Sequence, residues 1–174
     1  MILPPGIWPL KKLPGSPLDY LISIEKVDDI PFAIGRELYE LWDSKRAGRL
    51  FPDRFDFRPE EMEALVPNVT FLHVERNPLA FRMHLVGTEI VNEMRFDIMG
   101  FKMEDVRGME DALVGFRWLL SNKQPYYCPS LPLEESPDGH ISYSIVCLPL
   151  SSDGEIIDWI ITCLNWEKAE DDTG

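Results

Sequence analysis

The alternation of apolar and polar residues after position 67 constrains the fold of this chain more than any other feature. VTFLHVER and FRMHLVG each place apolar side chains at every second position, and Asn77-Pro78 stands between them. A period of two is the spacing of a β-strand, and Asn-Pro favours a turn. The sequence therefore predicts a hairpin with strands at 68–76 and 80–87.

Three further strands are expected near the end of the chain. Residues 126–133 have strand character but contain prolines, which favours an edge strand. ISYSIVCLPL follows the turn pair Asp138-Gly139, and EIIDWIITCLNW follows Asp153-Gly154. These segments predict strands at 141–150 and 155–166.

Helical spacing of apolar residues predicts the remaining elements. It extends over residues 31–46, and a shorter helix is expected at 59–65. Thr88 is expected to cap a short helix that reaches residue 95, and an amphipathic helix is expected at 110–120. The order predicts an α+β protein: a five-stranded antiparallel sheet with helices on one face and an N-terminal helical extension.

The length of 174 residues fits one domain. Residues 1–30 are expected to be a proline-rich arm, because five prolines occur in the first 18 positions and proline lacks the amide donor of regular structure. The helical extension is placed at 31–66, the core at 67–166 and an acidic tail at 167–174.

The composition excludes several classes of partner and site. The net charge of −13 opposes binding to nucleic acid and to anionic membranes. No signal peptide or membrane-spanning run is recognisable, so a cytoplasmic location is expected. Three widely spaced cysteines argue against both a disulfide framework and a thiolate zinc site.

Three ordered segments carry a resemblance to a known family. They are LYELWDSKRAGRLFPDRFDFRPEEMEALVPNVTFLHVER, FRMHLVGTEIVNEMRFDIMG and LPLSSDGEIIDWIITCL. Together, over about residues 38–165, they resemble a divergent PAS-domain subfamily of small free-standing bacterial proteins. The resemblance implies two leading strands, a helical lid and three closing strands around a cavity, which would make 67–166 a PAS-like core. It also implies a sensory role, but it identifies no ligand.

The chain departs from the two chromophore-binding patterns of PAS domains. No cysteine occurs in 92–96, where light-sensing members carry the one that reacts with flavin, and no histidine occurs in 88–122, where haem-binding members take an axial ligand. Met94, Met99, Met103 and Met109 leave an unusual haem ligand open. The cofactor, if there is one, stays unknown.

Aromatic and methionine side chains suggest a pocket, although such residues more often form an ordinary core. Phe71, Phe81, Met83, Leu85, Tyr143, Ile145, Trp159 and Ile161 are expected beneath the lid, and Met94, Phe96, Met99, Phe101, Phe116 and Trp118 within it. The ligand-binding candidates are Arg82, Met94, Arg95, Phe96, Phe116, Tyr127, Tyr143 and Trp159. Among them, Arg82, Arg95 and Tyr127 are the polar groups expected to orient a ligand.

Residues capable of chemistry have simpler explanations. His73 and His84 lie in the predicted hairpin without a third metal ligand, and His140 lies in a turn. Cys128 could line a pocket, but an ordinary edge-strand cysteine is the simpler explanation and the one preferred. No nucleophile elbow or cysteine–histidine pair is recognisable, so no catalytic residue is named and enzymatic activity is not expected.

The sequence thus predicts a sensory or protein-interaction PAS domain that can bind a small apolar molecule and signals through a partner protein. A homodimer is expected, held through 31–42 or through the arm, because an apolar helix before a compact domain often pairs with a copy of itself. Two alternatives stay open: a small-molecule enzyme that uses the same pocket, and a structural adaptor with a filled core.

Overall fold

The computed structural model describes residues 21–132 and 141–168 of the chain. Helices and strands alternate in blocks along it, as the sequence predicts. The strands are β1 (Ile22–Ser23), β2 (Val69–Glu75), β3 (Ala80–Val86), β4 (Tyr126–Pro132), β5 (Ile141–Leu150) and β6 (Trp159–Lys168). The α-helices are α1 (Ala33–Arg46), α2 (Pro59–Met62), α3 (Thr88–Met94) and α4 (Glu110–Asn122). Short 3-10 turns are η1 (Val27–Asp29), η2 (Arg54–Asp56), η3 (Val66–Asn68) and η4 (Met103–Asp105).

The strands within the described residues form one antiparallel sheet in the order β1-β4-β5-β6-β2-β3. The expected α+β class is confirmed, and so are the β2–β3 hairpin and the closing β4–β5–β6 meander. The expected number of five strands is wrong by one, because β1 adds to the edge of β4 by pairing Ile22 with Tyr127 and Ser23 with Tyr126. A two-residue strand is too short to produce a periodic signal in the sequence.

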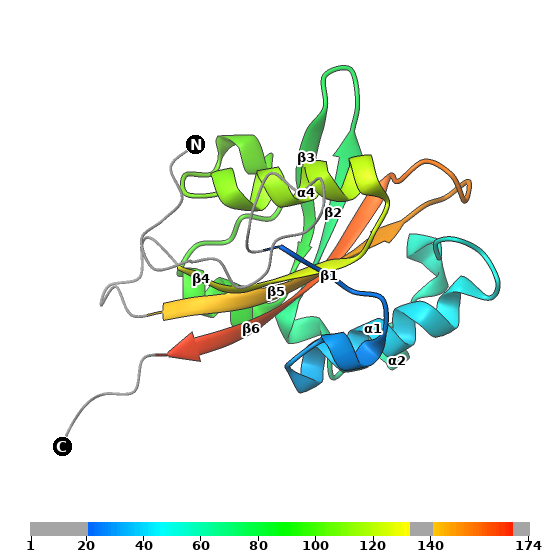
Figure 1. Ribbon diagram of the computed structural model, residues 1–174. Helices are drawn as coiled ribbons and strands as arrows, with labels where there is room; N and C mark the ends of the chain where they lie inside the picture. Colours follow the sequence, from blue (N-terminus) through cyan, green and yellow to red (C-terminus); the bar gives the residue numbers. More distant parts are fainter. Residues whose placement is uncertain (1–20, 133–140, 169–174) are drawn as a thin grey trace.

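Helices cover both faces of the sheet, not one. Figure 1 shows α4 on one side of the sheet and α1 with α2 on the other. Strand β5 is consequently buried without interruption from Tyr143 to Leu150. A strand covered on both faces is expected to show such a continuous apolar run rather than alternation.

Helix α1 covers the second face with its own apolar stripe. Leu38, Tyr39 and Trp42 are buried in the core, and Trp42 Nε1 donates a 2.9 Å hydrogen bond to the carbonyl of Pro149 on β5. The side chains expected to hold a homodimer are therefore already packed against the sheet of the same chain. The homodimer itself stays a prediction.

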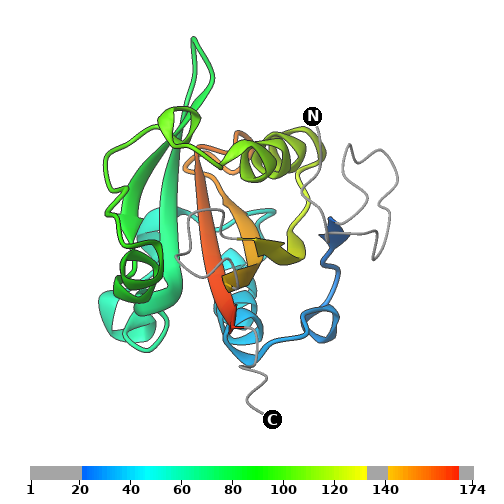
Figure 2. The same cartoon turned by 90° about the vertical axis from the view of Figure 1, so that its left-hand side faces the viewer.

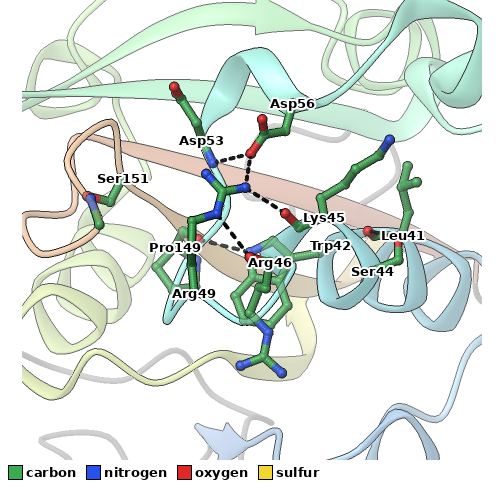
Figure 3. A network of polar contacts seen from close by, with 11 residues as sticks. Leu41, Trp42, Ser44, Lys45, Arg46, Arg49, Asp53, Asp56, Pro149 and Ser151 are labelled. Atoms are coloured by element: carbon green, nitrogen blue, oxygen red, sulfur yellow. Dashed lines mark hydrogen bonds and ion pairs between the residues drawn. The ribbon is translucent and has the colours of Figure 1, made fainter.

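A polar network fixes the loop that follows α1 (Figure 3). The helix ends at Ala47 in a left-handed conformation, and Arg49 folds back so that its guanidinium donates to the carbonyls of Lys45 and Arg46 at 2.8 and 2.9 Å. Arg49 also pairs with Asp56, whose carboxylate accepts a 2.9 Å bond from the Asp53 amide. Partial burial raises the pKa of Asp56, but these hydrogen bonds outweigh it and leave the pKa below its usual value.

Gly87 joins β3 to α3 at a point where two backbones nearly touch. A Cβ at this position would lie 2.2 Å from the carbonyl oxygens of Val66 and Pro67. Its φ of −65° is open to any residue, so close approach rather than backbone freedom requires glycine here. Gly87 is also the N-cap of α3, so the expectation that Thr88 caps this helix is wrong by one residue.

Candidate functional site

The PAS-like core has a small, partly open apolar cavity between the sheet and the lid. Figure 2 shows α4 above the sheet and α3 beside the β2–β3 hairpin. The cavity has a volume of about 40 Å³. The sheet contributes its floor with Thr70, Met83, Tyr143, Ile145, Thr162, Leu164 and Trp166.

The lid contributes aliphatic, methionine and aromatic side chains to the same cavity. They come from α3, η4, α4 and the segments between them, and they are Ile90, Met94, Ile98, Met103, Met109, Ala112 and Phe116. Four of the seven methionines in the chain therefore line this one cavity. Methionine is unbranched and adapts its shape to irregular gaps, so this wall is the deformable side of the cavity.

The volume limits what the cavity holds in this conformation. A buried water needs at least about 10–15 Å³, whereas an engineered apolar cavity that binds benzene measures roughly 150 Å³. A cavity of about 40 Å³ thus has room for one or a few small atoms. A larger molecule requires the lid to move.

Two polar groups at the floor satisfy each other. The hydroxyls of Thr70 and Thr162 form a hydrogen bond across the β2–β6 pair, and both residues are buried. A buried hydroxyl that already has a hydrogen-bond partner within the protein does not need one from a ligand. The floor next to this pair is therefore suited to apolar contact.

Three of the eight ligand-binding candidates lie at the cavity: Met94, Phe116 and Tyr143. Phe116 also packs against Phe81, with 5.4 Å between ring centroids, so the two form the wall between α4 and β3. Whether these residues bind a ligand stays a prediction.

Arg82 lies outside the cavity, at the outer edge of β3. Its guanidinium pairs with Glu75 at 3.0 Å and donates a 2.8 Å hydrogen bond to the carbonyl of Gly100. The hydrogen bond with Arg82 holds the pKa of Glu75 below its usual value. The expected polar contact of Arg82 is thus made with the chain itself.

Three other candidates are also outside the cavity. Arg95 is exposed just after α3, in the left-handed conformation, and Phe96 is half-exposed with its ring 5.5 Å from that of Phe101. Tyr127 lies on β4 opposite Ile22.

Trp159 faces away from the cavity, and the expected phase of β6 is wrong. Residues directly opposite in an antiparallel pair share a face, and β5 places Tyr143 opposite Trp166 and Ile145 opposite Leu164. The even-numbered residues of β6 therefore reach the cavity, whereas Trp159 and Ile161 belong to the other face. There Trp159 contacts His73, His84 and Arg54, with the Arg54 guanidinium carbon 4.5 Å from its ring centroid.

The same error of phase affects β2 and part of β3. Phe71 lies on the face opposite the cavity, where it contacts Phe57 and Arg54. A β-bulge between Phe71 and Leu72 then places Leu85 opposite Phe71 instead of under the lid. Thr70, Thr162, Leu164 and Trp166, which sequence reasoning missed, occupy the floor instead.

The described residues capable of ligating a metal or acting as nucleophiles are dispersed. Between residues 21 and 132 and from 141 to 168, no three His, Cys, Asp or Glu side chains are grouped to hold a metal ion. His140 lies outside the described residues. All three cysteines are free and buried, and burial raises the pKa of Cys147 and Cys163 to about 12.

Comparison with known proteins supports the reading of the fold. No curated protein matches the chain, and none of the described helices has the length and hydropathy needed to cross a membrane. Residues 33–110 match the family model described as a PAS domain. The match runs from α1 to the start of α4 and includes the hairpin and most of the lid. Over residues 33–110, the chain is similar to the PAS domain family.

Proposed function

We propose that this PAS domain is a sensor that admits a small apolar molecule to the cavity between its sheet and its methionine-rich lid, and that it signals the occupied state to a partner protein. The observation that carries the proposal is the cavity itself, with apolar walls on both sides and four methionines around it. A sensory or interaction role is typical of the family; the ligand and the partner are the proposed part.

The lid is suited to expand when a molecule enters. Helix α3 has only seven residues, and η4 only three, so neither is a long rigid element. Met83, Met94, Met103 and Met109 can change rotamer without displacing a branched chain. A molecule larger than about 40 Å³ would therefore be accommodated by rearrangement of the methionines and of the lid backbone.

Methyl NMR of the methionines tests the proposal directly, with benzene as the first probe because apolar cavities bind it. Benzene is expected to shift the ε-methyl signals of Met83, Met94, Met103 and Met109. Met62, which is buried but outside the cavity, and the exposed Met99 are internal controls. Shifts of equal size at all methionines, or none at the four, would count against an apolar binding site.

Native mass spectrometry of protein purified from its own host then asks what the cavity holds. A small molecule retained at one copy per chain, and lost on denaturation, supports the proposal. Its chemical identity would replace benzene in the NMR titration, where the same four methyl groups are expected to respond.

Two observations favour a second candidate, a protein-interaction domain with a filled core. The cavity of about 40 Å³ is already small for a ligand site. The outer surface of the lid also exposes Phe96, Met99 and Phe101, each with 44–56% of its area accessible. In such a domain, benzene would not shift the methionine methyl signals and the purified protein would retain no small molecule. The partner protein would bind whether or not a small molecule is present.

A further inference from the structure

The lid is fastened to the sheet along the outer edge of β3. The Gly100 amide donates to the Met83 carbonyl at 2.7 Å, and the Met83 amide donates to the Phe101 carbonyl at 2.9 Å. Lys102 continues this contact as a bridge with Arg82. A short stretch of the lid therefore pairs with β3 as though it were a further strand.

Side chains reinforce this backbone contact at two points. Arg82 reaches Glu75 on β2 with one side of its guanidinium and the Gly100 carbonyl with another nitrogen. One turn later, the Glu104 carboxylate accepts from the Phe81 amide at 3.1 and 3.3 Å. Arg82 thus joins the hairpin to the lid, because a guanidinium can donate in two directions at once.

The fastened segment also forms part of the cavity wall. We call residues 98–104 the lid strap. Ile98 and Met103, which are 2% and 3% exposed, line the cavity from either end of the strap, whereas Met99 and Phe101 point to the solvent side. If the strap left β3, two wall side chains would leave the cavity with it.

We propose that the lid strap is the gate of the cavity and that Arg82, held by Glu75, controls how often the gate opens. The contacts between the strap and β3 are at the edge of the sheet, and Arg82 and Glu75 have 39% and 31% of their side-chain area exposed. Opening here would uncover Ile98 and Met103 but would leave α4 on the sheet, where Phe116 and Leu119 are almost fully buried. The inference rests on the proposed function, since a gate has a role only where a molecule enters.

Hydrogen exchange measures the opening without any ligand. Arg82→Ala is expected to raise the exchange rates of the Gly100 and Met83 amides by about fivefold or more, because hydrogen bonds to charged groups are among the stronger ones. Amides in the middle of β5 should be unchanged. Arg117→Ala, which removes an exposed arginine from α4, is the matched control and should alter neither group. Unchanged Gly100 and Met83 rates in Arg82→Ala would overturn the role of Arg82.

Methionine oxidation measures access to the cavity, again without a ligand. Dilute hydrogen peroxide converts accessible methionine to its sulfoxide. In Arg82→Ala, Met103 is expected to oxidise several-fold faster than in the wild type, while Met62, equally buried but on the other side of the sheet, keeps its rate. Equal acceleration at both would indicate general loosening and would overturn the gate.

Benzene uptake connects the gate to the proposed function. Arg82→Ala and Glu75→Gln are each expected to increase the rate at which the methyl signals of Met103 and Met109 exchange between free and bound states, with a smaller change in affinity. Faster amide exchange without faster uptake would show that molecules enter elsewhere. Absence of benzene binding in every variant would refute the proposed function, while the oxidation of Met103 would still decide whether the strap opens.

Discussion

Replacement of Gly115 by alanine tests the packing between the lid and the sheet. Gly115 lies inside α4, and a Cβ there would stand 2.3 Å from the hydroxyl oxygen of Tyr126 and 3.0 Å from its Cζ. Tyr126 cannot withdraw easily, because it is 2% exposed and its ring packs edge-on against Trp118. Glycine at this helical position is therefore explained by the tyrosine that it faces.

The expected magnitude follows from two opposing effects. Alanine raises helix propensity by about 1 kcal/mol over glycine. Overpacking of a filled core costs about 1–3 kcal/mol, and displacement of the Tyr126 hydroxyl from its hydrogen bond with the Cys147 side chain adds about 1 kcal/mol. We expect Gly115→Ala to lower the free energy of unfolding by about 1–3 kcal/mol, which for a chain of this size lowers Tm by roughly 2–12 °C.

Urea denaturation followed by circular dichroism measures this change, with Ser121→Ala as the control for helix propensity alone. Tyr126→Phe removes the atom nearest to the added methyl group. The double variant is therefore expected to recover at least about 1 kcal/mol relative to the sum of the single variants, which is within the range of coupling between residues in contact. A Gly115→Ala protein as stable as the wild type, or a double variant with no coupling, would refute the close contact.

Three further outcomes are expected. Gly87→Ala should destabilise the protein by about 3 kcal/mol or more, because two backbone carbonyls cannot yield as a side chain can; a soluble variant with unchanged urea midpoint would contradict this. Asp56→Asn should lower the free energy of unfolding at neutral pH. The difference in stability between this variant and the wild type should disappear as the pH falls through the lowered pKa of Asp56. The reason is that the carboxylate stabilises the fold above its unfolded pKa of about 3.9 and stops doing so once it is protonated. Cys147 should resist iodoacetamide at pH 8 in the native protein and react after denaturation, because a pKa of about 12 leaves almost no thiolate; rapid native labelling would show that its burial is not maintained.

Elements that depend on local chemistry could be predicted from the sequence. The β2–β3 hairpin followed from alternation and from Asn77-Pro78, and α1 and α4 followed from helical spacing. The match to the PAS family model was also predictable, because the resembling motifs lie partly within the matched residues 33–110. Each of these features is specified by residues close together in the chain.

Features that depend on pairing between distant segments could not be predicted in the same way. The cavity-facing side of β6 is set by its register with β5, and a shift of one residue exchanges Trp159 for its neighbours. The bulge beside Phe71 reverses the phase of Leu85 by the same principle. Arg82 was predicted to contact a ligand because its actual partner could not be seen in the sequence. That partner is the carbonyl of Gly100 in the lid, and the sequence does not specify the path of the lid past β3.

The pairing of the lid strap with β3 also affects how this sheet avoids contact with other sheets. An uncovered edge strand offers unpaired amides and carbonyls that can recruit a strand from another molecule. Here the Met83 groups are occupied by Gly100 and Phe101, while the opposite edge carries the two-residue β1 on the proline-containing β4. Each opening of the strap would uncover the β3 edge for as long as it lasts. Frequent admission of molecules and resistance to aggregation are therefore opposing demands on the same few hydrogen bonds.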